Sequence, residues 1–169
     1  MKKIIHLTVF LAVVAGLAGA ALSFANNMTA PIIEENNLKA EKENLAVVFP
    51  NAKEFEIVNI KSGADKSIKT IYKTETDDYV YKVSVVGFKD NIIFMLGIQN
   101  DGTIKDFVVL QNNDTSGIGT QVNNENFKAK FVGQKIGSNV DTISGATVSS
   151  SAVVRGIDAV AQYHSANVK

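Results

Sequence analysis

The chain has 169 residues, of which 46% are apolar and 20% charged, and its formal charge at pH 7 is zero. That length suits one membrane segment and one folded domain, and no basic patch indicates nucleic-acid binding. Cysteine is absent, which excludes a disulfide framework and any thiolate site for zinc or an iron–sulfur cluster. The two histidines, His6 and His164, lack metal-ligand spacing with carboxylates, so no metal site is predicted.

The N-terminal segment has the composition of a membrane helix. Residues Ile4–Ala25 form an almost uncharged run that is long enough to cross a bilayer. Because Lys2 and Lys3 precede this run, we expect residues 1–26 to be a single-pass anchor in the cell (inner) membrane, with the rest of the chain on the extracytoplasmic side. A signal peptide cleaved after Ser23-Phe24-Ala25 is the alternative, but the run exceeds a usual signal core.

A second helix is expected in residues 27–50, between the membrane segment and the domain. Thr29 suits the N-cap and Pro31 the first turn, where its missing N–H is harmless. The pattern ends at Val48, before Pro50, and its centre is strongly polar. These features predict a solvated juxtamembrane helix whose end docks on the domain.

Residues 51–169 are predicted to form a single α+β domain on a mostly antiparallel sheet with flanking helices. Five segments have strand-like composition or alternate apolar and polar residues, and Asn100-Asp101-Gly102 is a strong hairpin signal between the last two. The expected strands are Phe55–Val58, Ile68–Thr74, Tyr79–Gly87, Ile92–Gln99 and Ile104–Gln111. A short helix is expected over Asn126–Gln134, with Phe127 and Phe131 in the core.

The last helix follows a turn of small residues. Its apolar stripe comprises Val153, Ile157, Val160, Ala161 and His164. Thr147 opens this helix, and the unpaired amides of a first helical turn attract phosphate. Gly145 and Ala146 leave the approach uncrowded. One interpretation is a phosphate site at Thr147, and the alternative is that Thr147 or Ser149 is only the N-cap.

The run Asp141-x-x-Ser144-Gly145-Ala146-Thr147 resembles the flavinylation motif of the FMN-binding domain family. Members include the G subunit of the Rnf electron transport complex and the C subunit of the sodium-pumping NADH:quinone oxidoreductase. The resemblance implies that Thr147 carries covalent FMN through a phosphoester bond, and that a flavin transferase installs it from FAD. The amides of Ser149 and Ser150 would then bind phosphoryl oxygens. Asp141 would orient the turn or be recognised by the transferase. The alternative is that Asp141 only starts the turn.

A second part of the resemblance lies in the loop Asn112–Gln121, at the place where the family has Glu-Thr-Pro-Gly-Leu-Gly against the flavin ring. Thr115, Gly117 and Gly119 match that pattern, whereas Asp114 replaces the glutamate and Ser116 the proline. The matching residues are therefore expected to contact the flavin through backbone amides and small side chains.

These features imply an electron-carrying subunit. By resemblance, the chain is a flavoprotein of an ion-translocating complex, similar to the Rnf G subunit, with membrane and iron–sulfur subunits as partners. No acid–base pair or nucleophile with a histidine is apparent, so no catalytic residue is predicted. The alternatives are a stand-alone extracytoplasmic flavin shuttle and a non-redox exported scaffold.

Overall fold

A computed structural model describes residues 2–168, without the side chains of residues 31–35, 37 and 38. The chain divides into two compact units, Met1–Lys42 and Glu43–Lys169. Helix α1 (Lys2–Val48) occupies the first unit, and its last turns belong to the second. The stretch Lys2–Ala30 is long and apolar enough to cross a membrane, a test that a signal sequence also passes.

The predicted start of a second helix at Thr29 is wrong, because α1 continues without a break through this position. The Thr29 hydroxyl donates to the carbonyl oxygens of Ala25, at 3.0 Å, and Asn26, at 3.3 Å. A threonine inside a helix commonly makes such bonds to the preceding turn, whereas an N-cap threonine would accept from the following one. The Thr-x-Pro pattern therefore lies within one long helix.

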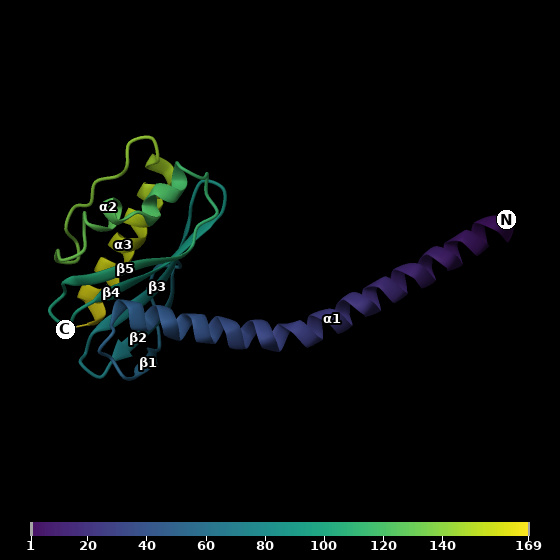
Figure 1. Ribbon diagram of the computed structural model, residues 1–169, viewed down its shortest axis with the longest axis horizontal. Coiled ribbons are helices and arrows are strands. Elements are labelled where there is room, and N and C mark those ends of the chain that lie inside the picture. Colours follow the sequence, from purple (N-terminus) through teal and green to yellow (C-terminus); the bar gives the residue numbers. More distant parts are fainter. Residues whose placement is uncertain (1, 169) are drawn as a thin grey trace. The chain divides into compact units, whose positions relative to one another are not determined.

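The second unit contains a five-stranded sheet in which every neighbouring pair is antiparallel, in the order β1-β2-β3-β4-β5 (Figure 1). This arrangement confirms the predicted α+β class. The elements are β1 (Phe55–Val58), β2 (Ile68–Thr74), β3 (Tyr79–Val86), β4 (Asn91–Ile98), β5 (Ile104–Gln111), the 3-10 helix η1 (Gly119–Asn123), α2 (Glu125–Lys128) and α3 (Thr147–Asn167). The five strands agree with the predicted segments to within one residue.

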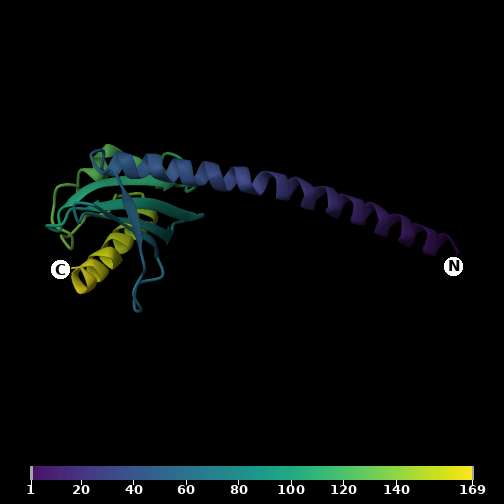
Figure 2. The same cartoon turned by 90° about the horizontal axis from the view of Figure 1, so that it is seen from below.

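The two faces of the sheet carry separate apolar cores. Helix α3 lies on one face and the last turn of α1 on the other (Figure 2). Helix α3 packs on one face with its predicted stripe of Val153, Ile157, Val160, Ala161 and His164, all buried. Gly156 permits this contact, because a Cβ atom there would lie 2.8 Å from a methyl group of Val85. On the other face, Leu45 and Val48 from the end of α1 pack with Phe49 against the sheet. The predicted docking of this helix end is confirmed.

The short helix predicted over Asn126–Gln134 is only partly present. Helix α2 ends at Lys128, and turns continue the chain. The amide of Gly133 donates to the carbonyl of Ile104 at 2.8 Å, and the amide of Ile104 donates to the carbonyl of Gln134 at 2.8 Å. These bonds to the start of β5 replace the bonds that a longer helix would make. Phe127 and Phe131 are nevertheless fully buried, as predicted.

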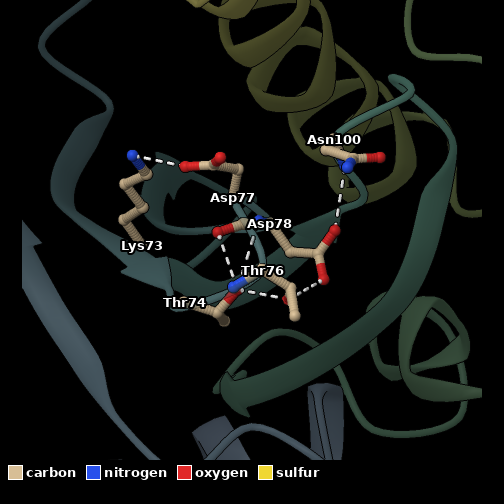
Figure 3. A network of polar contacts seen from close by, with 6 residues as sticks. All are labelled: Lys73, Thr74, Thr76, Asp77, Asp78 and Asn100. Carbon is tan, nitrogen blue, oxygen red and sulfur yellow. Dashed lines mark hydrogen bonds and ion pairs between the residues drawn. The ribbon is translucent and has the colours of Figure 1, made fainter.

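At one end of the sheet, a polar network joins the β2–β3 turn to the β4–β5 hairpin (Figure 3). The Asp78 carboxylate accepts from the Thr76 hydroxyl at 2.7 Å and from the Asn100 amide at 2.9 Å. Asp77 adopts a left-handed φ of 61° within the turn, and its carboxylate pairs with Lys73. This network closes the end of the sheet opposite the β3–β4 turn, where the candidate site lies.

Candidate functional site

Helix α3 begins at Thr147, and its N-cap is Ala146. No side chain caps this helix, so the alternative in which Thr147 or Ser149 serves as the N-cap is wrong. The physical reason is that Gly145, with a left-handed φ of 83°, turns the chain one residue earlier than a threonine cap would require. Thr147 is exposed, and within residues 2–168 its hydroxyl has no hydrogen-bond partner.

Ser150, in the first turn of α3, stabilises the turn that precedes this helix. Its hydroxyl accepts from the amide of Ile143 at 3.0 Å and donates to the carbonyl of Ala146 at 2.9 Å. The Ser150 amide donates to the same carbonyl at 3.0 Å, so it is not free for a phosphate, contrary to the prediction. In the described part of the chain, the amides of Thr147, Val148 and Ser149 find no acceptor. The anion-attracting end of α3 therefore comprises these three groups.

A cavity of about 390 Å³ lies beside Thr147. It is lined by Phe88, Thr115, Ile118, Gly119, Gly145, Ala146, Thr147, Val148 and Ser149. The three large apolar side chains of this set are unusually open to solvent: Phe88 is 64% exposed, Ile118 49% and Val148 53%. Exposed apolar side chains around one concave site are typical of a ligand or partner surface.

Asp114 lies behind the cavity wall and is buried. Its carboxylate accepts from the amides of Phe88 at 2.9 Å and Lys89 at 2.7 Å, and from the Ser149 hydroxyl at 2.6 Å. Burial alone would raise the pKa of Asp114, but these donors outweigh burial and hold the pKa below its ordinary value. The group is therefore ionised at neutral pH.

Two glycines let the chain approach Asp114 closely. A Cβ atom at Gly87 would lie 2.5 Å from a carboxylate oxygen of Asp114. A Cβ atom at Gly119 would lie 2.5 Å from the Asp114 Cβ and 2.7 Å from the Ser149 hydroxyl. Gly119 thus brings the loop after β5 against the start of α3, where both segments line the cavity.

Four of the predicted site residues lie outside the cavity lining: Gly117, Asp141, Ser144 and Ser150. Gly117 has a left-handed φ of 74° and shapes the loop, and its amide donates to the Thr120 hydroxyl at 2.9 Å. Asp141 and Ser144 are exposed. Ser144 lines a separate groove with Lys130, whose ammonium group donates to the carbonyl of Asp141 at 3.1 Å. The structure therefore brings together Thr115, Gly119, Gly145, Ala146, Thr147 and Ser149, with Ser150 behind them.

Four residues of this site were not predicted from the sequence. Phe88, Ile118 and Val148 are apolar residues that a sequence reading assigns to a core or leaves unremarked, and only the fold shows them exposed around one cavity. Asp114 was noted as a substitution within the loop and not as a site residue. Its position beside a Gly-x-Gly loop was the one available signal, because an acid there can accept from nearby backbone amides.

The chain is similar to several known proteins. Residues 87–162 match the model of a family described as the FMN-binding domain, which confirms the predicted resemblance. The chain is 29% identical over 181 residues to the G subunit of the ion-translocating oxidoreductase complex of Methanosarcina acetivorans, covering 98% of this chain and 96% of that protein. It is 25% identical over 170 residues to the G subunit of the proton-translocating ferredoxin:NAD(+) oxidoreductase complex of Clostridium ljungdahlii, covering 92% and 89%. The solved structure of Shewanella oneidensis NqrC aligns with 65% of each chain, with a TM-score of 0.47 and 21% identity.

Proposed function

We propose that this chain, whose residues 87–162 match the model of the FMN-binding domain family, is an electron-transfer flavoprotein subunit that holds FMN as a phosphoester on Thr147. It works within a membrane ion-translocating oxidoreductase complex, as its relatives' names state for them. The domain lies on the extracytoplasmic side, anchored by the stretch Lys2–Ala30. Membrane and iron–sulfur subunits of the complex are its partners.

One observation carries this proposal: the Thr147 hydroxyl is exposed and, within residues 2–168, without a partner at the mouth of an apolar cavity. A threonine at a helix start usually caps the helix, and here the cap position belongs to Ala146. The hydroxyl is therefore available for modification. The unpaired amides of Thr147, Val148 and Ser149 suit the charge of a phosphodiester, which such a helix end stabilises by about 0.3–1 kcal/mol.

The cavity fits the flavin in its chemistry. A flat, largely apolar ring requires apolar walls and close backbone approach, and Phe88, Ile118 and Val148 supply the walls while Gly119 supplies the approach. FMN would supply the electron-transfer chemistry that no side chain of this cysteine-free chain offers. The protein's own residues would hold the ring, shield part of it from water and set its electrostatic surroundings.

Attachment is a phosphoryl transfer with no change in oxidation state. The Thr147 oxygen forms a bond to the FMN phosphorus of FAD, the pyrophosphate bond breaks, and AMP leaves with the proton of the hydroxyl. A flavin transferase catalyses this step, because the described residues near Thr147 offer no general base: the carboxylate of Asp114 is buried and occupied by its donors. The transferase is therefore a maturation partner of this chain.

The test is the intact mass of the full chain after co-expression with a flavin transferase. We expect the wild type to gain the mass of FMN less one water, and Thr147→Ala to gain nothing. Thr142→Ala is the matched control, because Thr142 is an exposed threonine of the same turn, and it should be modified fully. An unmodified, colourless wild type would favour the non-redox scaffold instead.

A further inference from the structure

The cavity beside Thr147 is built from three separate segments, and all three converge on one buried carboxylate. The β3–β4 turn contributes Phe88, the loop after β5 contributes residues 115–119, and the start of α3 contributes residues 145–149. Asp114 begins the loop and binds the other two segments, through the amides of Phe88 and Lys89 and through the Ser149 hydroxyl. No other described residue hydrogen-bonds to both of these segments.

The charge of Asp114 is held without a cation. Its hydrogen-bond donors are two backbone amides, a weaker third amide from Asp90 at 3.4 Å, and one hydroxyl, all of which are neutral. No lysine or arginine in residues 2–168 forms an ion pair with it. A buried charge is screened far less by solvent than an exposed one. The negative charge therefore acts on the cavity, whose lining residues Gly119 and Ser149 pack directly against Asp114.

We propose that Asp114 is a positioning residue of the flavin site: it fixes the three cavity segments relative to Thr147, and its uncompensated charge lowers the reduction potential of the bound ring. The inference rests on the proposed function and adds to it a residue outside the cavity lining. A fixed negative charge near a redox group disfavours the uptake of electrons, because reduction adds negative charge to the same region. Asp114 thus couples the geometry of the site to its electronic properties.

Asp114→Asn tests the charge, because the amide has the same shape and its one oxygen can take the place of Oδ2, which accepts from the Phe88 amide and the Ser149 hydroxyl. The bond from the Lys89 amide, which goes to Oδ1, is lost. In the flavin-loaded full chain, we expect a higher midpoint potential than in the wild type. The matched control is Asp90→Asn, which neutralises an exposed carboxylate in the neighbouring turn and should shift the potential much less. Equal potentials in Asp114→Asn and wild type would overturn the electrostatic part of the inference.

Ser149→Ala tests the positioning, because it keeps the charge of Asp114 and removes the bond to α3. We expect the initial rate of FMN transfer to Thr147, with purified transferase and FAD, to fall by about tenfold, the equivalent of one hydrogen bond to a charged group. Ser151→Ala, two residues along the same helix, should load at the wild-type rate. Wild-type loading by Ser149→Ala would overturn the positioning role.

A third readout needs no flavin. In the unloaded full chain in detergent, the amides of Phe88 and Lys89 are protected by Asp114. Their hydrogen exchange should become about tenfold faster in Asp114→Asn, since asparagine has one acceptor oxygen in place of two and a neutral oxygen binds more weakly than a carboxylate. Unchanged exchange would contradict the inference. If the wild type never carries FMN on Thr147, the proposed function fails, whereas this exchange measurement still judges the role of Asp114.

Discussion

Gly119 and Ser149 lie so close together that a single added carbon would not fit between them: a Cβ atom at Gly119 would lie 2.7 Å from the Ser149 hydroxyl. They are 30 residues apart in the sequence, and both line the cavity beside Thr147. Their contact joins the loop after β5 to the start of α3. The shape of the cavity therefore depends on the absence of a side chain at Gly119.

Gly119→Ala should push the loop away from α3 and destabilise the domain by about 1–3 kcal/mol, because the surrounding atoms belong to a tightly bound segment. Thermal unfolding of the full chain measures this change. Ser116→Ala is the control in the same loop, because Ser116 is exposed and does not line the cavity. If the two variants unfold alike, close packing at Gly119 does not hold the site.

Phe88→Ala should leave the unfolding temperature nearly unchanged, because the Phe88 side chain is 64% exposed and buries little apolar area. In the flavin-loaded chain, however, iodide should quench the flavin fluorescence more strongly, since the loss of one apolar wall exposes the flavin ring. Val86→Ala provides the comparison, because Val86 is similarly open but does not line this cavity. If iodide quenches the flavin equally in Phe88→Ala and in the wild type, Phe88 does not cover the flavin.

The stability of the domain should fall as the pH falls below about 6.5. Burial lowers the pKa of His164, whose Nδ1 lies 2.8 Å from the Tyr81 hydroxyl. The unfolded chain then binds a proton at a higher pH than the folded chain, so acid favours unfolding until the folded pKa is reached. The urea midpoint of the wild type should drop between pH 7 and pH 5, and that of His164→Gln should drop less. His6→Gln, which changes an exposed histidine of α1, should behave like the wild type.

Gly97→Ala should weaken the docking of the end of α1 on the sheet. A Cβ atom at this position of β4 would overlap a methyl group of Val48 and lie 3.1 Å from the Phe49 ring. We expect a loss of about 1–3 kcal/mol and faster proteolysis near residues 43–49. Val47→Ala, at an exposed position of the same helix end, should change neither measurement. If proteolysis near residues 43–49 is no faster in Gly97→Ala than in the wild type, the docking of the helix end does not need this close contact.

The strands and the start of α3 could be predicted because their signals are local. Alternation marked the strands, and the turn around Gly145 placed Thr147 at the helix start. The error at Thr29 arose because a threonine before a proline also occurs inside long helices, where its hydroxyl bonds the preceding turn. The early end of α2 depends on bonds to Ile104 in a distant strand. No local pattern contains that information.

The candidate site was predictable only on its α3 side and in its loop. Gly145 and Gly119 could be identified from motifs, since a left-handed φ at Gly145 and a close approach at Gly119 favour glycine. Thr147 followed from its resemblance to the flavinylation motif. Phe88 could not be identified in this way. It lies in the β3–β4 turn, nearly 60 residues before Thr147, and only the sheet brings it beside Thr147. The role of Asp114 likewise depends on the fold, since its donors come from two distant segments.

Fragmentation of the tryptic peptide that ends at Arg155, taken from a chain matured with flavin transferase, identifies the residue that carries the flavin. Cleavage at Lys135 and Arg155 leaves Thr147 in one peptide together with several other hydroxyl residues, including Thr142, Ser144 and Ser149. We predict that the FMN phosphoester is localised on Thr147. A flavin on another hydroxyl of this peptide, or a fully matured chain without flavin, would contradict the account.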